Sequence, residues 1–518
     1  MASTAHRVIK NTGFLYVRTI VSLLLNFFTT RYLLQALGVS DYGLYNVIGG
    51  SLIMLGFLSG SMSSATQRFI SYTEGSGDIS MIKKVFSNAV ILHYILALIC
   101  FVVYVVIGLV FFNGLLSIPD GQYVDAVIVY MCMIVSTIFA ITVVPYDAEI
   151  NAHEKMSVYA VIGILDVVLK FLIAISLFWF ADDRLIFYSV LMALEAIFIR
   201  ALTKQYCKRN YEECRQPLSF RSYDRAIIKS MLSFSGWNLW LLASGMLSFY
   251  GGNVILNHYF GTTVNAAMGI AMQLAGAMMA ATSNMKKALL PALVKAEGER
   301  NHDQMLRLTM VGSRISFALF SFICVPVLGY LNSALGIWLD IVPVLATSFC
   351  FIYIVSKLLE EGTALLYNSI CADGNIKYYC IVRGLFNILP LIVTTVMFYN
   401  GIDNPLWFII NWLIGYSIIG GVVNIYYSKK IISLSAADFV HSVILPVMLS
   451  SVIAAAISFV SSYYNHNVLH IQPLLAIMIS YVMAIPVYWY ISVNRNERTL
   501  IYGFVKKLHS KRHHDDNI

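Results

Sequence analysis

Three ionisable residues fall inside apolar segments long enough to cross a membrane. Asp166 and Lys170 are four residues apart in segment 157–180, and Glu195 lies at similar depth in segment 185–205. A helix places residues four apart on one face. A charge in the middle of a membrane helix costs about 2.5 kcal/mol or more on insertion scales, so each of these residues needs a reason. Two interpretations stay open: a neutralised structural cluster that ties the two segments together, or a site where Lys170 contacts an anionic head group or takes part in ion coupling.

Two arginines in the first apolar segment, 12–36, are further candidates for substrate binding. Arg18 lies about two helical turns from the start of this segment. Its side chain either snorkels to the interface or faces a cavity at its cytoplasmic mouth. Arg31 lies near the other end, where basic residues are rare, which favours a cavity. The planar guanidinium suits phosphate because it can form two parallel hydrogen bonds.

A charged run at 357–361 adds Glu360 to the candidates for ion coupling. Lys357 and Glu361 are four residues apart and can pair, which leaves Glu360 on another face of a helix. Glu360 is then either a carboxylate that relays a proton or binds sodium, or part of a solvated helix end.

Motifs for catalysis or metal binding are absent from the sequence. It contains no Walker loop, no GxSxG, no HExxH and no paired CxxC. Cys207 and Cys214 share one basic loop, in which no His or Cys pair completes a zinc site. The sequence therefore predicts neither an enzyme nor a metal site.

The elements that must position these residues are membrane-spanning helices. The chain has 59% hydrophobic and 12% charged residues and a mean hydropathy of +0.74, which excludes an ordinary soluble domain. Apolar runs of about twenty or more residues are long enough to cross a bilayer. Fourteen such runs predict an all-α polytopic membrane protein: 12–36, 42–66, 84–112, 122–144, 157–180, 185–205, 228–254, 262–284, 306–331, 341–363, 379–399, 405–428, 438–462 and 472–493.

The orientation of these segments follows from the loops. Lys and Arg gather in alternate loops and in the C-terminal tail, whereas the other loops hold mainly Asp, with Arg184 and Arg31 as their bases. The positive-inside rule then places both termini in the cytoplasm. The formal net charge of +8 is read as a topology signal and as contact with anionic lipid heads, not as a nucleic-acid-binding surface.

An internal repeat divides the chain. Residues of the same type recur 223 positions apart, as at Gly13 and Gly236, Gly38 and Gly261, and Glu74-Gly75 and Glu297-Gly298. A second match, 220 positions apart, relates 151–159 to 371–379. Parallel repeats are typical of transporters with a substrate path between two lobes. We therefore expect a six-helix lobe at 1–215, a second at 216–430, and two added helices with a basic tail at 431–518.

The candidate residues are distributed unevenly over this repeat. Most lie in the first lobe, and the equivalent positions in the second lobe are mostly apolar. We therefore expect the fold to be duplicated and the binding surface not to be.

Two stretches resemble a known family. Leu37-Gly38-Val39-Ser40-Asp41-Tyr42-Gly43-Leu44-Tyr45 is similar to the motif after the first helix of bacterial polysaccharide exporters, and Asn151-Ala152-His153-Glu154-Lys155-Met156-Ser157-Val158-Tyr159 to the turn after their fourth. These exporters are the Wzx-type repeat-unit flippases of the multidrug/oligosaccharidyl-lipid/polysaccharide (MOP) superfamily, which has a MATE-like fold. The resemblance covers the whole chain, including the plan of six, six and two helices.

The resemblance implies a flippase of the bacterial cytoplasmic (inner) membrane. Its cargo would be an undecaprenyl-pyrophosphate-linked oligosaccharide, such as a repeat unit of lipopolysaccharide O-antigen, capsule or exopolysaccharide, moved to the outer leaflet by alternating access. No cofactor is expected, and coupling to protons or sodium stays open. Expected partners are membrane lipids and the polyprenyl-linked glycan, with a polysaccharide polymerase and a chain-length regulator as candidates; no nucleic acid is expected, and a monomer is favoured. The lumen candidates are Arg18, Arg31, Asp166, Lys170 and Glu195.

Two alternatives remain. A cation-coupled multidrug exporter of the same superfamily typically has twelve helices, so the added pair counts against it. A membrane glycosyltransferase or polymerase of the same pathway usually needs a sizeable outer loop for its acceptor, and the loops here are short.

Overall fold

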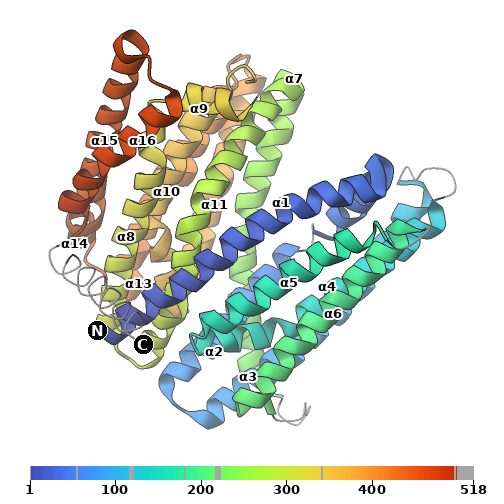
Figure 1. The fold of residues 1–518 in the computed structure, drawn as a ribbon. Helices are drawn as coiled ribbons and strands as arrows, with labels where there is room; N and C mark the ends of the chain where they lie inside the picture. Colours follow the sequence, from blue (N-terminus) through green and yellow to red (C-terminus); the bar gives the residue numbers. More distant parts are fainter. Residues whose placement is uncertain are drawn as a thin grey trace, which may run out of the picture. The chain divides into compact units, whose positions relative to one another are not determined.

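The protein is an assembly of helices (Figure 1). The computed structural model describes residues 2–53, 56–115, 122–179, 183–215, 223–339, 342–494 and 498, and these residues contain no β-strand. Within these ranges, twelve helices are long and apolar enough to cross a membrane. The other two predicted segments, 42–66 and 341–363, fall on the junction of α1 (Ala2–Ile53) with α2 (Gly56–Ser76) and on the charged α10 (Ala346–Asp373). The all-α polytopic fold is therefore confirmed, and the orientation of the termini stays a prediction.

The chain forms two compact units. The N-terminal unit contains Lys10–Leu239 and Val294–Asn301; the C-terminal unit contains Trp240–Leu293 and the described residues before Lys10 and from His302 onward. Each unit joins segments that are distant in sequence, whereas the predicted lobes are continuous stretches of chain. The predicted boundaries at 215/216 and 430/431 therefore stay predictions.

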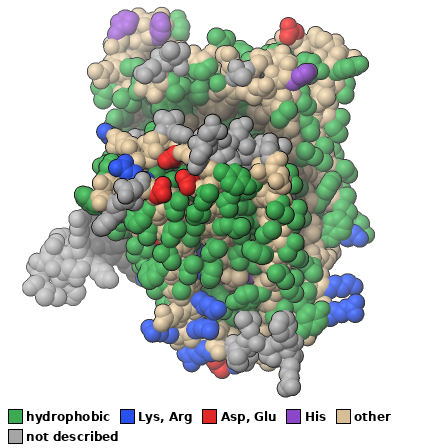
Figure 2. Space-filling view, turned by 90° about the vertical axis from the view of Figure 1, so that its right-hand side faces the viewer, with side chains coloured by type: hydrophobic (Ala, Val, Ile, Leu, Met, Phe, Trp, Pro, Cys, Tyr) green, Lys and Arg blue, Asp and Glu red, His purple; other side chains and the backbone are tan. Residues whose placement is uncertain are grey.

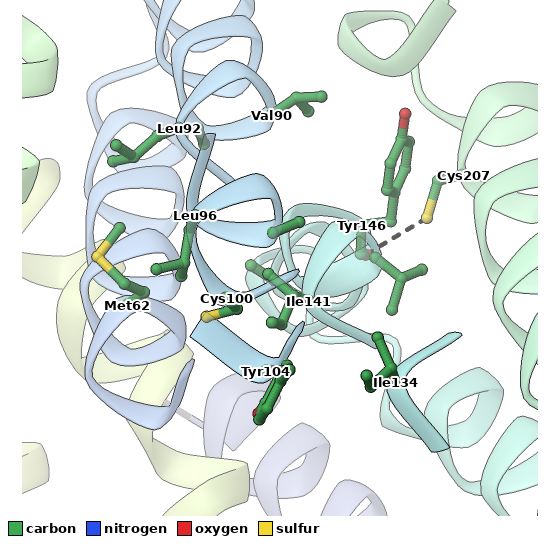
Figure 3. Close-up of a cluster of buried hydrophobic side chains, with 14 of the residues drawn as sticks. Met62, Val90, Leu92, Leu96, Cys100, Tyr104, Ile134, Ile141, Tyr146 and Cys207 are labelled. Atoms are coloured by element: carbon green, nitrogen blue, oxygen red, sulfur yellow. Dashed lines mark hydrogen bonds between the residues drawn. The ribbon is translucent and has the colours of Figure 1, made fainter. Parts of the chain in front are cut away.

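The N-terminal unit is centred on α4, which packs against α2, α3 and α6. Figure 3 shows its apolar core, to which α2 contributes Met62, α3 contributes Leu96 and α4 contributes Ile141. The thiol of Cys207 on α6 donates a hydrogen bond to the carbonyl of Tyr146, 3.4 Å away. The elements of this unit, besides α1 and α2, are α3 (Ile79–Val110), η1 (Phe111–Leu115), α4 (Tyr123–Ala152), α5 (Met156–Ser176), α6 (Arg184–Asn210), η2 (Glu213–Arg215) and both ends of α7 (Arg225–Gly298).

The C-terminal unit packs α8 and α13 against α10. Phe317 of α8, Phe349 of α10 and Phe408 of α12 are fully buried in its apolar core. The predicted added pair is α14–α15 and α16, which pack on α8 through small and polar side chains, as membrane helices often do. The hydroxyl of Ser458 on α15, for example, donates a 2.7 Å hydrogen bond to the carbonyl of Pro326 on α8. After α7, the elements are α8 (His302–Leu328), α9 (Leu331–Trp338), α10, α11 (Lys377–Tyr399), α12 (Leu406–Trp412), η4 (Leu413–Ile419), α13 (Gly420–Ile432), α14 (Ala436–Phe439), η5 (Val440–Ile444), α15 (Leu445–Tyr464), η6 (Asn465–Leu469), α16 (Pro473–Val487) and η7 (Tyr488–Ser492).

The surface is as apolar as a lipid environment requires. Figure 2 shows a face on which hydrophobic side chains cover most of the surface and many Lys and Arg side chains gather near the lower edge. Side chains such as Ile99 and Leu98 on α3 are more than half exposed. Such residues would be unfavourable in water and are expected where a helix faces lipid tails.

The backbone confirms the internal repeat. Gly38 and Gly261 interrupt α1 and α7 with nearly the same geometry, φ 77° and ψ 174° against φ 79° and ψ −174°. A left-handed φ is uncommon outside glycine. Two further pairs of left-handed residues occur at the repeat distances, Gly77 (φ 72°) with Arg300 (φ 58°) and Glu154 (φ 54°) with Gly374 (φ 97°). The internal repeat in the sequence therefore extends to the backbone conformation of the turns that end the helices.

A second glycine pair brings two repeat-related helix ends together within the N-terminal unit. A Cβ atom added to Gly75 of α2 would overlap the carbonyl oxygen of Lys295, and one added to Gly298 would overlap the carbonyl oxygen of Tyr72. The contact is reciprocal because Gly75 and Gly298 are themselves equivalent in the repeat. Small residues of this kind allow membrane helices to approach closely.

This contact makes the first prediction. Gly75→Ala or Gly298→Ala should each destabilise the protein by about 1–3 kcal/mol, because the new methyl group meets backbone, which cannot rotate away. Gly13→Ala and Gly236→Ala are matched controls, since these repeat-related glycines have no atom within 4 Å of an added Cβ. The controls should be neutral or stabilising by up to about 1 kcal/mol, from helix propensity. Melting temperatures of the purified variants in detergent measure the effect; four equal melting temperatures would contradict it.

Candidate functional site

The predicted ionic cluster on α5 and α6 is present. Lys170 Nζ lies 2.7 Å from Asp166 Oδ2, and the carboxyl group of Glu195 on α6 interacts electrostatically with both side chains. Glu195 is 6% exposed, whereas the Lys170 and Asp166 side chains are 32% and 22% exposed. Within the described part of the chain, Glu195 Oε1 has no hydrogen-bond partner, and Arg200 is the other cation acting on Glu195. The cluster therefore combines an accessible ion pair with a buried carboxyl group.

Arg18 lies against the same helix. Its guanidinium carbon is 4.6 Å from the centre of the Tyr159 ring, and its side chain occupies the space that a Cβ atom on Gly163 would need. Tyr159, Gly163, Asp166 and Lys170 follow one another at steps of four, three and four residues, so they share one face of α5. Gly163 and Lys170 are about 10 Å apart along the helix axis at 1.5 Å per residue. Two cations, Arg18 from α1 and Lys170 from α5, thus lie at different positions along one face of α5.

The repeat has an equivalent of this packing in the C-terminal unit. Trp240 of α7 fills the space over Gly384 of α11, as Arg18 of α1 does over Gly163 of α5. These positions are 222 and 221 residues apart, close to the repeat distance. An indole therefore replaces the guanidinium, which makes the cation a property of the N-terminal unit.

Arg31 is placed differently from the other candidates. It is exposed on α1 and makes no hydrogen bond or ion pair with the residues that the structure describes. Its neighbour Tyr32 packs its ring against Phe171 and Phe178, with centroids 6.0 and 6.1 Å apart. The structure thus brings Arg18 to α5 and leaves Arg31 outside the cluster.

The expected pairing on α10 is wrong. Lys357 Nζ pairs with Glu360 Oε2 at 2.7 Å, whereas Glu361 accepts from Lys286 Nζ of α7 at 2.6 Å and from the hydroxyl of Ser316. Glu361 is 3% exposed. A cation from another helix reaches Glu361, so Lys357 is left for Glu360. Glu360 is also not at a helix end, because α10 continues to Asp373.

The C-terminal unit has further buried charges that the sequence analysis missed. Arg383 is 6% exposed, and its guanidinium carbon lies 4.6 Å from the centre of the Tyr416 ring. Lys357 Nζ lies 5.6 Å from the centre of the same ring. Within the described residues Arg383 Nη1 has no hydrogen-bond partner, so these two cations around one aromatic ring form a second candidate anion site.

The expectation that the binding surface is not duplicated stays a prediction, although the candidate charges of the second lobe are not limited to Glu360. The repeat-equivalent positions are apolar, but the C-terminal unit carries its charges at other positions. The signal was present in the sequence, because Arg383 lies inside the apolar segment 379–399 and Lys286 directly follows the segment 262–284.

Comparisons with known proteins agree with this architecture. Residues 8–297, more than half of the chain, match the family described as polysaccharide biosynthesis protein. No curated protein matches the sequence at a significant level.

Solved structures match the fold at low sequence identity. One is an outward-facing multidrug resistance MATE family transporter of the MOP superfamily, at TM-score 0.65 and 14% identity over 82% of this chain and 95% of the other. Another is a MOP superfamily transporter from Pyrococcus furiosus, described as having a binding pocket of reverse polarity, with the same TM-score, identity and coverage. A third is a MATE protein in its bent conformation, at TM-score 0.68 and 14% identity over 83% and 96% of the two chains. At these identities the likeness shows the fold.

Proposed function

Because this chain belongs to the polysaccharide biosynthesis protein family and has the fold of the MOP transporters, we propose that it is a flippase for a lipid-linked oligosaccharide. The proposed cargo is a glycan repeat unit carried on undecaprenyl pyrophosphate, moved from the inner to the outer leaflet of a bacterial cytoplasmic membrane by alternating access. The observation that carries this proposal is the face of α5 shared by Arg18 and Lys170. The Arg18 side chain of α1 lies against Gly163, about 10 Å along the α5 axis from Lys170, and two cations placed in this way suit a diphosphate with its first sugar.

The two cations would act differently. The Arg18 guanidinium can give two parallel hydrogen bonds to phosphate, whereas Lys170 acts as a point charge. Lys170 is held by Asp166 at 2.7 Å, with Glu195 behind them. A proton taken up by either carboxyl group would weaken that hold and free the ammonium group for the cargo. Proton coupling through Asp166 and Glu195 therefore belongs to the proposal.

An apolar cavity supports a lipid-linked cargo. A cavity of about 490 Å³ between α15 and α16 is lined mainly by aliphatic side chains, among them Ile457, Val460 and Met483. It lies on the helix pair that distinguishes this chain from twelve-helix exporters. A polyprenyl tail could stay in such a groove or in the adjacent lipid while its head group is moved.

Gene deletion in the native host tests the proposed function. Surface polysaccharide should disappear, lipid-linked repeat units should accumulate on the cytoplasmic side, and the wild-type gene should restore both. Unchanged surface glycan in a clean deletion would contradict the proposal. Retained export of the glycan by a strain that lacks the polymerase would separate transport from polymerisation.

Drug export is the second candidate, because solved MATE transporters share the fold. Expression in a pump-deficient strain should then lower its susceptibility to cationic drugs. The lipid-linked glycan remains favoured, since the family match is to polysaccharide biosynthesis proteins.

A further inference from the structure

A compact cluster of one histidine and three carboxylates lies at the end of α4 in the N-terminal unit. His153 Nε2 is 2.9 Å from Glu213 Oε1 of η2 and 3.7 Å from Glu149 Oε2 of α4. One ligand-type atom from each of these three residues lies within 4.8 Å of the others. His153 Nδ1 contacts the fourth member, Glu74 Oε1 of α2, at 2.9 Å. The cluster thus joins the ends of α2 and α4 to the segment after α6.

Glu149 is the member of the cluster whose burial is not explained by hydrogen bonds to the other members. Its side chain is fully buried, and within the described residues neither carboxylate oxygen has a hydrogen-bond partner. Its contact with His153 at 3.7 Å is longer than a hydrogen bond. A buried carboxylate without partners is costly, so a position like this one usually reflects a ligand or a proton.

His153 is oriented as a metal ligand would be. Its Nδ1–H can donate to Glu74, which leaves Nε2 facing Glu149 and Glu213. A carboxylate on the second ring nitrogen is the usual support of a metal-bound histidine. The ring is also held in place by Tyr211, which stacks on it at 4.0 Å between centroids and 2° between planes.

The charged groups around the cluster leave room for a divalent cation. Lys295 Nζ lies 3.4 Å from Glu74 Oε2, whereas the nearby Lys83 is paired with Glu212. Metal ligation requires a neutral imidazole. A divalent ion on His153 Nε2, together with Lys295, would then balance the carboxylates of Glu74, Glu149 and Glu213.

We propose that Glu149, His153 and Glu213 bind a divalent transition metal ion. One imidazole nitrogen and two carboxylate oxygens suit Zn²⁺ or a similar ion, whereas Mg²⁺ and Ca²⁺ prefer oxygen ligands alone. Ligands of a tetrahedral zinc ion lie about 3.3–3.5 Å apart, given bonds of about 2.0–2.1 Å. The distances of 2.9 and 3.7 Å from His153 lie on either side of this value, so small side-chain rotations complete the site. The ion would fasten the end of α4 to η2, with Glu74 of α2 held through His153, and would leave one position for water.

Zinc binding to the purified full-length protein tests the proposal. All variants carry His513→Ala and His514→Ala, which removes two adjacent histidines, a common type of zinc ligand, that lie outside the described part of the chain. After dialysis against Zn²⁺ and removal of loosely bound ion, this parent should retain about one Zn²⁺ per chain. Glu149→Gln and Glu213→Gln should each lower retention at least about tenfold, as expected for loss of one of three ligands.

Glu212→Gln is the matched control, since Glu212 neighbours Glu213 in sequence but is 67% exposed and pairs with Lys83. It should bind zinc like the parent. Zn²⁺ should also raise the melting temperature of the parent and of Glu212→Gln, and leave that of Glu149→Gln unchanged. Equal zinc retention by all variants, or none by a folded parent, would overturn the proposal.

Cobalt gives an independent measurement should a glutamine variant fail to fold. Co²⁺ bound to the parent should show the visible absorption of a tetrahedral or five-coordinate site, and Zn²⁺ but not excess Mg²⁺ should displace it. Absence of this absorption, or displacement by Mg²⁺, would leave His153 as a purely protonic bridge. Because zinc retention does not depend on transport, failure of this test leaves the proposed flippase function standing.

Discussion

Lys170→Ala should reduce export of the lipid-linked glycan at least about tenfold, since a hydrogen bond to a charged group contributes about 1.5–3 kcal/mol. Lys170→Arg should retain most of the export, because it keeps a cation on the same face of α5. The physical reason is the placement of Lys170, which is 32% exposed beside Asp166 and shares that face with Arg18. Surface polysaccharide in the complemented deletion strain, at equal amounts of protein in the membrane, measures the effect.

A double variant separates binding from structure. Lys170→Ala alone leaves Asp166 and the buried Glu195 without their nearest cation, so it also disturbs the ion pair. Asp166→Asn combined with Lys170→Ala removes both charges of the pair. If Lys170 only balances the cluster, the double variant should regain export; if Lys170 contacts the cargo, it should regain protein level but not export. Equal export by Lys170→Ala and Lys170→Arg would show that Asp166, Lys170 and Glu195 have a structural role and do not bind the cargo.

The contacts that the sequence predicts correctly are local. Asp166 and Lys170 are one helical turn apart, and Glu195 lies on the next helix along the chain, so spacing and segment depth are enough to place them together. The break at Gly38 and its repeat at Gly261 are predictable for the same reason, because each follows from a few neighbouring residues. A glycine at the same place in both repeats points to a backbone shape that other residues adopt with difficulty.

The contacts that the sequence did not predict join distant segments. Lys286 and Glu361 are 75 residues apart, and nothing in their own segments indicates that they pair. The cluster around His153 draws on α2, α4 and η2, so no spacing within one loop could reveal it. The sequence analysis looked for zinc ligands within the loop of Cys207 and Cys214 alone, and therefore found none. The repeat also did not indicate the second cationic site. The position equivalent to Arg18 in the second lobe is apolar, whereas the cations around Tyr416, Arg383 and Lys357, lie at other positions.

Glu361→Leu is expected to destabilise the protein by about 3–5 kcal/mol, the usual cost of leaving one partner of a buried ion pair uncompensated. Glu361 lies 2.6 Å from Lys286 Nζ, and the two side chains are 2% and 16% exposed. The hydroxyl of Ser316 loses its acceptor in the same change. Reversible unfolding in mixed micelles gives the free energy of unfolding of each variant.

Two comparisons show whether burial is the cause. The Lys83–Glu212 pair has the same 2.6 Å separation but exposed fractions of 23% and 67%, so Glu212→Leu should cost no more than about 1 kcal/mol. Lys286→Met combined with Glu361→Leu removes both buried charges and should recover most of the lost stability, because apolar side chains of similar volume replace a buried pair at little cost. A double variant as unstable as Glu361→Leu alone would show that the pair holds α7 to α10 by geometry. Recovery would instead mean that the pair is dispensable for folding, which would make Lys286 and Glu361, like the more exposed pair of Lys170 and Asp166, candidates for contact with cargo or ions.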